Sequence, residues 1–447
     1  MRRSLLVVCI WALLLGCAVT PEPRFEALQE LSSPRVDGEL VWSRSPEDSD
    51  AIEKRVAALL ADGVTRQEAI QIALLNNHLL QISLDQLGVA EADFVQAGLF
   101  TNPSFGAFLG FPLSNGESDL GLSVFLSDLW QVPARKKVAA ANVEATIREV
   151  GTVVVATAAN AAAAFDDVLL RQALLGLAED DVKLSDAFQT REEIRYRHGL
   201  AILPAVEAAR AQHAEMRVHF AEAKEALVKA LTELDTVLSL RGERSDFEVV
   251  GDLAILPQTD WEPEAAIAFA LANRLDIARN EARVQSAERA IGYQKTLIFR
   301  SASAGAGYQG TFSSGSQNNN WGPTFGLEVP LFDQNQAQIA KAKYRLSQHQ
   351  KMLDAVHVTA QAQVLDALAL YEAAEIGVLE IENEVLPELD SAIAFSEQWS
   401  KARQLVLLEQ LLLEKSRLSA VRELMWERKR VRRADILLHQ ALWGGDS

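Results

Sequence analysis

The sequence predicts a mostly α-helical fold with a small β part, in which one structural unit occurs twice along the chain. The motif Gly-Leu-x-Val-x-Leu-x-Asp at residues 121–128 returns at residues 326–333, a spacing of 205. An upstream pattern, Ala-Ile at residues 69–70 with Asn76, returns as Ala-Ile at residues 266–267 with Asn273, a spacing of 197. Self-similarity at a fixed spacing indicates an internal repeat. The difference of eight between the spacings locates an insertion, which we expect to be a loop, in the Gly/Ser/Asn-rich residues 310–320.

The repeat divides the chain into five predicted segments. These are a signal peptide (1–16), an N-terminal leader that we expect to be extended (17–61), a first repeat (62–241), a linker (242–261) and a second repeat (262–447). Helical patterning in the first repeat starts at Thr65, with Glu68 completing a capping box, and runs to about Gln96.

The N-terminus has the composition of a targeting segment. Arg2 and Arg3 precede an apolar run at residues 5–15 that is too short to span a bilayer as a helix. The run ends in Leu-Leu-Gly-Cys, which resembles the lipobox of bacterial lipoproteins, cleaved before Cys17 and acylated on it, for instance with palmitate. Ala18 follows instead of the aspartate that retains such lipoproteins at the inner membrane, so outer-membrane delivery is favoured. The alternative is an ordinary signal peptide with an incidental cysteine.

Charge and composition exclude several classes of function. The formal net charge is −18, and removal of Arg2 and Arg3 with the signal makes it −20. A chain this acidic is not expected to bind nucleic acid. The mature chain keeps a single cysteine and therefore forms no internal disulfide. Beyond the signal, no uninterrupted apolar run reaches 18 residues, so a membrane-crossing part is expected to be a closed β-barrel.

Four segments alternate with the period of two that is typical of strands with one apolar face. They pair as two hairpins, residues 102–111 with 118–128 and residues 301–311 with 321–331. Apolar residues on one face and small or polar ones on the other are typical of a barrel wall. Four strands cannot close a barrel alone, so the membrane hypothesis requires an oligomer. A half-buried hairpin in a soluble domain would alternate equally well.

Very long helices follow each hairpin. Residues 134–198 contain few helix-breaking residues and predict a helix of about 90 Å. In the second repeat, apolar residues recur in heptads that indicate coiled-coil packing; they are Val364, Tyr371, Val378, Val385, Ala392 and Trp399, with Ala367, Ala374, Ile381 and Phe395 between them. The chain is predicted to turn back near Gly199 and again near Gln404.

An antiparallel hairpin centred near residue 402 brings opposite charges together. It predicts three ion pairs, or alternatively two separately solvated faces; the pairs are Arg432–Glu372, Lys429–Glu375 and Arg422–Glu382.

In this order of elements, the chain resembles the TolC-type outer-membrane efflux proteins over about residues 62–444. Local motifs agree with the family; they are Asn102-Pro103, Pro330-Leu331-Phe332-Asp333, Tyr196-x-x-Gly199 and Leu386-Pro387. The resemblance implies a homotrimer that forms a twelve-stranded barrel on a long α-helical coiled-coil tunnel through the periplasm. It also implies a periplasmic adaptor (membrane fusion) protein, an inner-membrane pump and outer-membrane lipid as partners. The second helical tip lacks the glycine that many relatives have there.

The sequence contains no arrangement that indicates catalysis, a cofactor or a metal. The seven histidines show no metal-ligand spacing with cysteine, and no nucleophile is ordered into a triad. We therefore predict a protein that is not an enzyme.

The favoured function is a passive exit duct of a tripartite efflux system. The alternatives are the outer-membrane duct of a type I protein-secretion system and a lipid-anchored periplasmic coiled-coil scaffold. The nature of the substrate does not follow from the sequence.

Two groups of residues are candidate functional sites. The helical tips are candidates for adaptor docking, with Gly199, Leu200, Gln404 and Leu405 as their residues; the alternative for Gly199 is a simple helix stop. In a trimer, carboxylates near the tips form rings that attract cations at the tunnel entrance; the candidates are Glu192, Glu193 and Glu397, with a solvated outer face as the alternative.

Overall fold

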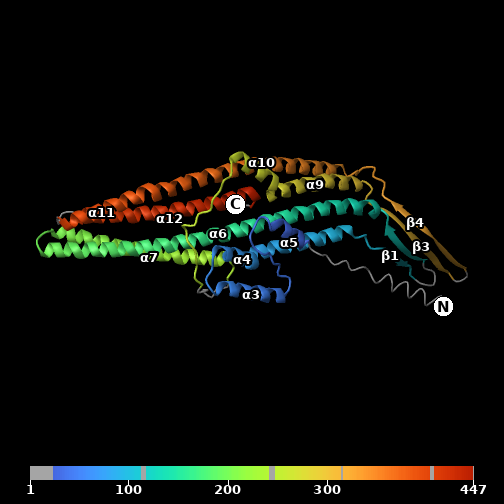
Figure 1. The fold of residues 1–447 in the computed structure, drawn as a ribbon. Helices are drawn as coiled ribbons and strands as arrows, with labels where there is room; N and C mark the ends of the chain where they lie inside the picture. Colours follow the sequence, from blue (N-terminus) through green and yellow to red (C-terminus); the bar gives the residue numbers. More distant parts are fainter. Residues whose placement is uncertain (1–23, 112–116, 241–246, 314–315, 403–406, 446–447) are drawn as a thin grey trace. The chain divides into compact units, whose positions relative to one another are not determined.

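A computed structural model describes residues 24–111, 117–240, 247–313, 316–402 and 407–445, and in these residues the chain is mostly helical with one four-stranded sheet (Figure 1). The helices that precede the first strand are α2 (Phe25–Ser32), α3 (Pro46–Leu60), α4 (Arg66–Asn76) and α5 (His78–Gly98). Strands β1 (Ser104–Leu109) and β2 (Glu117–Phe125) lead to α6 (Asp128–Arg197) and α7 (Leu203–Val237). Then follow α8 (Pro263–Asn273), α9 (Leu275–Thr296), β3 (Ala302–Ser313), β4 (Ser316–Leu327), α10 (Gln336–Glu380), the π-helix η1 (Ile381–Val385), α11 (Leu386–Ala402) and α12 (Leu407–Trp443).

The chain divides into two compact units. The first, here unit 1, contains all four strands together with Leu84–Val150 and Ile277–Val356. The second, unit 2, contains Gln29–Ser83, Gly151–Asp276 and the chain from His357 onward. Each unit thus draws on both of the repeats that the sequence predicts, because the longest helices pass from one unit into the other.

The predicted long helix after the first hairpin is present as α6, which has 70 residues and is therefore about 105 Å long. An 18-residue window of α6 has a mean hydropathy of 1.6, enough to qualify for a membrane span by length and composition. Because 72% of that window is buried inside the protein, the apolar composition is also that of a core helix. No other described helix passes the same test.

Unit 2 is held together by apolar clusters between helices. The first cluster joins α3, α4, α6 and α7, with Phe165 and Leu234 fully buried at its centre. Two further clusters join α12 to α8 and α10. In these clusters Val364, Tyr371 and Val378 are buried, which confirms the predicted heptad pattern over its first half.

The heptad pattern changes phase at the π-helix. Val385 and Phe395 are exposed, so the prediction that they continue the buried seam is wrong. The N–H of Leu386 bonds to the carbonyl of Ile381, five residues back, which adds one residue to that turn. The half-buried or buried positions beyond it are Leu386, Leu389, Ala392, Ile393 and Ser396. The predicted Ala392 thus stays half-buried, while the other positions are shifted by one residue. The wider turn immediately precedes Pro387, which has no N–H for a helical bond.

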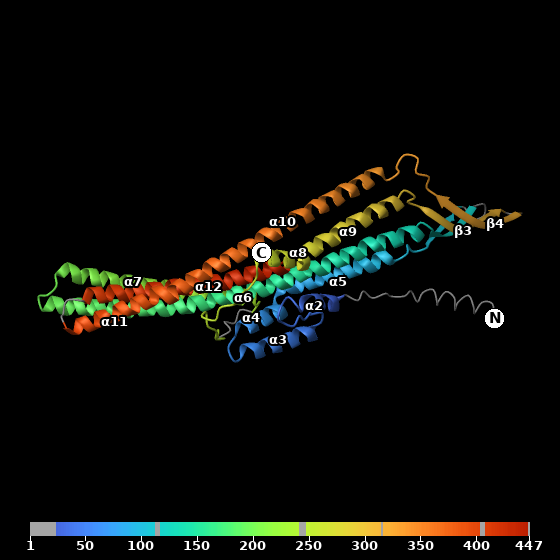
Figure 2. The same cartoon turned by 45° about the horizontal axis from the view of Figure 1, so that its top comes forward.

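The four strands form one antiparallel sheet in the order β1-β2-β3-β4 (Figures 1 and 2). All four predicted strands are present, but the expectation of a loop at residues 310–320 is wrong. β3 continues to Ser313 and β4 begins at Ser316, with Gly310 paired to Asn319. The backbone N–H and carbonyl groups of these residues are hydrogen-bonded between the two strands. The inserted residues therefore lengthen the hairpin.

The leader also differs from the expected extended chain. Its described part contains α2 and α3. Ser45 and Asp48 form a capping box at the start of α3, Pro46 occupies the first turn, and Ile52 and Val56 are buried. The capping box and one apolar face were therefore sufficient to form α3.

A further correction concerns the single helix predicted from Thr65 to about Gln96. The predicted cap is present, since Thr65 and Glu68 form a capping box, but the helix is broken at Asn77. The Asn77 side chain donates to the carbonyl of Val237 and accepts from the N–H of Leu80, so it starts α5 as a new helix.

The three predicted ion pairs are wrong, although the helices do run back along each other. In unit 2 the cations of α12 pair with aspartates of α6 instead; the pairs are Arg432–Asp166, Lys429–Asp167 and Arg422–Asp181. Glu382 pairs with Arg428 at 2.7 Å. The prediction considered only the two helices of one repeat, whereas α12 also packs on α6, as the cluster of Ile436 with Ala159 and Ala162 shows.

Removal of the Arg432 guanidinium should destabilise unit 2. Arg432 and Asp166 are both buried and lie 2.8 Å apart, so Arg432→Ala leaves a buried carboxylate with its contacts reduced. We expect a loss of about 3 kcal/mol in the free energy of unfolding, measured by urea titration. The exposed neighbour Arg433 is the control, and Arg433→Ala should change stability by less than about 0.5 kcal/mol. Equal effects of the two substitutions would contradict the assignment.

Candidate functional site

The sheet of unit 1 has two chemically different faces. The first face is apolar over most of its length; its apolar residues are Phe105, Ala107, Leu109, Leu120, Leu122, Val124, Ala302, Ala304, Ala306, Tyr308, Trp321, Pro323, Phe325 and Leu327. At one end, Leu109 lies in a row with Ser118, Gly310 and Asn319. The second face has mostly small or polar residues, with Phe108 and Phe125 as the exceptions; the others include Ser104, Gly106, Asp119, Gly121, Ser123, Ser303, Gly305, Gly307, Gln309, Asn320, Gly322, Thr324 and Gly326.

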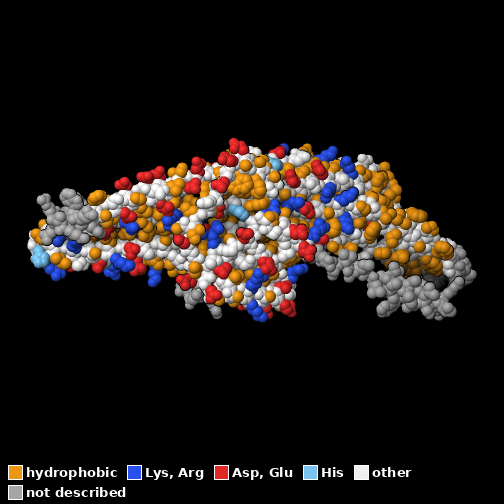
Figure 3. Space-filling view, in the orientation of Figure 1, with side chains coloured by type: hydrophobic (Ala, Val, Ile, Leu, Met, Phe, Trp, Pro, Cys, Tyr) orange, Lys and Arg blue, Asp and Glu red, His pale blue; other side chains and the backbone are white. Residues whose placement is uncertain are grey.

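The register of the strands makes the apolar face continuous. Phe105 lies opposite Leu122, Leu122 opposite Ala306, and Ala306 opposite Pro323, so one row crosses the whole sheet. The face is uncovered within the chain: Trp321 is 84% and Phe325 is 79% exposed. Figure 3 shows hydrophobic side chains over the strands. An uncovered apolar surface of this extent marks a contact with lipid or with another protein.

On the opposite face, neighbouring strands approach each other so closely that small residues are needed. A Cβ atom on Gly305 would lie 2.3 Å from the carbonyl oxygen of Leu122, so glycine is required there. The strands of 12 residues, β3 and β4, are each about 40 Å long, and a tilt of about 45° reduces their height to about 28 Å.

The first helical tip has a defined end geometry. Gly199 has φ 72°, a conformation that favours glycine, and its N–H bonds to the carbonyl of Tyr196 at 3.0 Å. The N–H of Leu200 bonds to the carbonyl of Arg195 at 2.8 Å. These two bonds form a Schellman motif, so Gly199 does act as a helix stop.

The same motif turns apolar side chains outward. Leu200 is 68% exposed, and the sequence analysis did not identify two further exposed residues at this tip, Ile202 and Leu203. A hydrophobic residue after a Schellman glycine often packs back on its own helix. Leu200 remains largely exposed and is available to a partner.

The two described entrance carboxylates are both paired with arginine. Glu192 is 6% exposed and accepts a hydrogen bond of 2.6 Å from Arg195. Glu193 accepts from Arg210 at 3.1 Å, and this bond, followed by one from Gln189, lowers the pKa of Glu193 below its usual range. Both side chains are therefore members of acid–arginine pairs, an arrangement that the sequence alone did not predict.

The remaining candidate residues lie outside the description. Glu397 belongs to α11, but its side chain is not among those described. Gln404, Leu405 and Cys17 lie outside the described residues.

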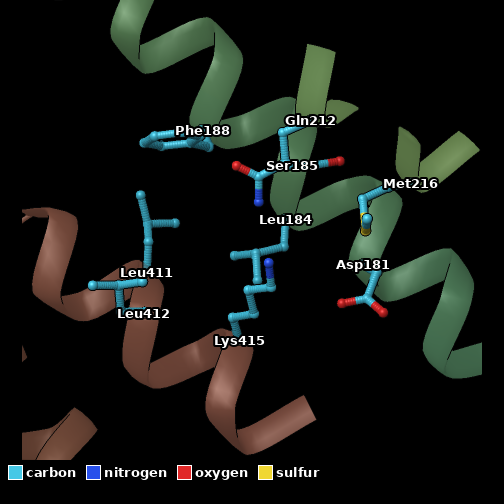
Figure 4. A pocket seen from close by; sticks show the side chains of 9 residues that line it. All are labelled: Asp181, Leu184, Ser185, Phe188, Gln212, Met216, Leu411, Leu412 and Lys415. Atoms are coloured by element: carbon cyan, nitrogen blue, oxygen red, sulfur yellow. The ribbon is translucent and has the colours of Figure 1, made fainter. Parts of the chain in front are cut away.

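A small cavity in unit 2 is bordered by α6, α7 and α12 (Figure 4). Leu184, Phe188 and Leu411 border it on the apolar side, and Ser185 and Gln212 on the polar side. Its volume of about 140 Å³ is well below that of a drug-sized binding site. It therefore does not suggest a substrate pocket. Within the described ranges, no group of three or more His, Cys, Asp or Glu residues is arranged to hold a metal ion.

A charge on the apolar face of the sheet should prevent membrane insertion. Leu122 lies in the middle of the apolar row, and a lysine near the centre of a bilayer costs about 2–4 kcal/mol per chain. We expect Leu122→Lys to lower the fraction of protein recovered in membranes by at least about tenfold. Asp119→Lys, on the opposite face of the same strand, is the control and should insert normally. Insertion of both variants at the wild-type level would exclude the apolar face as a lipid contact.

Comparisons with known proteins give similarity at the level of structure. No family model matches the sequence, and no curated protein matches it. CusC, described with its transmembrane channel formation, is 21% identical with a TM-score of 0.69 over 85% of this chain and 92% of its own. The outer membrane protein VceC of Vibrio cholerae is 18% identical, with a TM-score of 0.69 over 85% of this chain and 96% of its own. The outer membrane channel MtrE of Neisseria gonorrhoeae is also 18% identical, with a TM-score of 0.67 over 85% and 89%. The chain has the fold of the TolC-type outer-membrane efflux channels that its sequence resembles.

Proposed function

We propose that this protein is the outer-membrane exit duct of a tripartite efflux system, which passively conducts substrates delivered by an inner-membrane pump and a periplasmic adaptor. The observation that most supports this function is the four-stranded sheet, with one continuous, exposed apolar face and one face of small polar residues. A periplasmic coiled-coil scaffold has no use for such a face. The similarity in fold to outer-membrane channels supports the same function.

The sheet alone cannot stay in a bilayer, and this supports a homotrimer. β1 and β4 are the two outer strands of the described sheet, so each pairs on one side only. Unpaired backbone groups are expensive in lipid, and closure of the sheet on itself removes them. Three copies joined edge to edge supply twelve strands, enough for a closed barrel with the apolar face outside.

An internal duplication accounts for the order of elements. α4 and α8 each have 11 residues, start 197 residues apart and are followed by a residue with extended backbone, Asn77 and Arg274. Two strands and a long helix follow each of them. We infer repeats at residues 62–241 and 262–447, separated by a linker at residues 242–261.

We further propose that Cys17 is the acylated N-terminus of the mature lipoprotein, because the sequence before it resembles a lipobox. Cys17→Ser should then abolish incorporation of a palmitate analogue. Equal labelling of the variant and the wild type would contradict the anchor. The barrel is a second attachment to the membrane, so efflux should be less affected than labelling.

The tips are the proposed docking sites for the adaptor, with Gly199 and Leu200 in the first and Gln404 and Leu405 in the second. The exposed Leu200 supports this proposal. Leu200→Asp should reduce cross-linking to the adaptor at least about tenfold, because it places a charge in an apolar contact. Gly199→Pro should do the same by removing the N–H that bonds to Tyr196. Val228→Asp, at an exposed apolar residue of α7 that is distant along the chain from both tips, is the control. Unchanged cross-linking in both tip variants, with intact trimers, would exclude this tip.

Conductance in planar bilayers tests the duct itself. The wild-type trimer should give stepwise currents, and a folded trimer without conductance would contradict the proposed function.

We also propose that Glu192, Glu193 and Glu397 form cation-attracting rings at the entrance. Replacement of all three by Gln should reduce the preference for cations and the block by multivalent cations. The exposed glutamates of α7, Glu215, Glu222 and Glu225, provide a control triple variant. Unchanged selectivity in the first triple variant would assign these glutamates to the outside of the tunnel.

A further inference from the structure

Three helical segments next to the strands of unit 1 are strongly basic in an otherwise acidic chain. Residues 129–143, 289–300 and 334–349 contain no Asp or Glu, although the whole chain has 61 acidic and 43 basic residues. We call their cations the cationic collar, which consists of Arg135, Lys136, Lys137, Arg289, Lys295, Arg300, Lys341, Lys343 and Arg345. This bias is local, because the remaining sequence has nearly two acids for every base.

The collar occupies the helical turns that adjoin the sheet. Arg300 precedes β3 by two residues, while Lys137 and Arg345 are each the tenth residue of α6 and α10, about 14 Å from the helix start. The helical segments of unit 1 lie in the order α5, α6, α9, α10, the same order as the strands that they join (Figures 1 and 2). The cations are thus distributed across three neighbouring helices.

Direct contacts fix this order of helices. Arg135 of α6 donates to the carbonyl of Ala97 in α5, and Arg289 of α9 donates to the carbonyl of Lys137 in α6. Asn335, just before α10, donates to the carbonyl of Gln294 in α9. The collar therefore belongs to a packed layer, which limits how far its cations can move apart.

Nearly all of these charges are unneutralised by the chain. Arg300 pairs with Asp333 at 2.8 Å. In the part of the chain that the structure describes, the other eight have no carboxylate within ion-pair distance, and seven of those eight are exposed. The Lys136 ammonium lies over the Phe94 ring, 5.0 Å from its centroid, which orients the side chain but does not cancel its charge. A cluster of like charges held together in this way is complementary to an array of anions.

The position next to the apolar face identifies the anion. In Figure 3, Lys and Arg side chains gather over the helices beside the hydrophobic side chains of the strands. Exposed aromatic residues are interleaved with the cations, namely Trp130, Phe299 and Tyr344. An apolar surface followed by a zone that mixes aromatic rings with lysine and arginine is the order in which a protein meets the core and the headgroup interface of a bilayer.

We propose that the cationic collar binds the phosphate groups of anionic phospholipids in the leaflet that adjoins the helices. This inference rests on the proposed function, because it requires the sheet to cross the membrane. It extends that function by assigning the protein a lipid preference: the collar sets the depth of the sheet in the bilayer and selects anionic lipid at the boundary. Each cation near an anionic surface contributes about fivefold in lipid binding at low salt.

The test is lipid competition around the full-length trimer, measured by tryptophan fluorescence. The protein is reconstituted in phosphatidylcholine vesicles with increasing phosphatidylglycerol whose acyl chains are brominated, and Trp130 and Trp321 report the bromines next to the collar and the sheet. The test variant is Lys341→Gln/Lys343→Gln/Arg345→Gln. The control is Arg217→Gln/Lys224→Gln/Lys229→Gln, three exposed cations of α7 in unit 2.

Wild-type protein should prefer phosphatidylglycerol by at least about fivefold at low salt, and the preference should approach unity at about 1 M salt, where charges are screened beyond roughly 3 Å. The preference of the collar variant for phosphatidylglycerol should be at least about fivefold lower than that of the wild type, while the α7 control keeps the wild-type preference. Equal preferences in the wild type and the collar variant, or an equal loss in the control, would overturn the inference.

Three outcomes separate this inference from the proposed function. Wild-type trimers that conduct current but show no lipid preference would overturn the collar alone. A collar variant with altered ion selectivity and an unchanged lipid preference would also overturn it, because the cations would then face the tunnel. Trimers that neither insert nor conduct would contradict the proposed function itself.

Discussion

The packing of unit 2 depends on a buried aspartate, Asp166 of α6. The Arg432 guanidinium lies 2.8 Å from its carboxylate, and Arg66 lies 3.6 Å from it. Arg432 also donates to the carbonyls of Asp252 and Ile255 in the segment before α8. One ionic group thereby joins α12, α6, the start of α4 and that segment. Because a buried charge without a partner is costly, these elements have little freedom to pack in another register.

The long helices solve a second problem, the mismatch between helical and heptad periods. A straight helix drifts relative to a seven-residue pattern, so a seam of several heptads requires either supercoiling or a local correction. In the second half of the chain the correction is the π-helix Ile381–Val385, which moves the buried positions by one residue. The same turn accommodates Pro387. The helix therefore changes the direction of its buried face without ending.

Unit 1 is organised by a gradient of polarity along its length. The strands present an uncovered apolar face, and the adjoining helical segments present lysine and arginine that, apart from Arg300, have no ion pair among the described residues. One surface exposes apolar area and the other concentrates like charge. In the proposed function, a bilayer with anionic headgroups would satisfy both surfaces at once.

The first helical tip both ends a helix and exposes an apolar side chain, and the sequence could not tell these two features apart. The bonds of Gly199 and Leu200 to Tyr196 and Arg195 make the glycine a helix stop, and the same geometry leaves Leu200 exposed. Behind it, Glu192 and Glu193 are each paired with an arginine, Arg195 and Arg210 respectively.

Local patterns in the sequence determined the elements of this protein. Alternation of apolar and small residues predicted all four strands, and the composition of residues 134–198 predicted α6, because both signals depend only on neighbours along the chain. The tertiary structure decided which helices meet. The partners of Arg432 and Arg422 are aspartates of α6, more than 200 residues away, and no spacing rule within one hairpin identifies them. The tertiary structure likewise decided which residues are buried beyond Ile381. There the N–H of Leu386 bonds to the carbonyl five residues back, and this bond leaves the heptad pattern in the sequence unchanged.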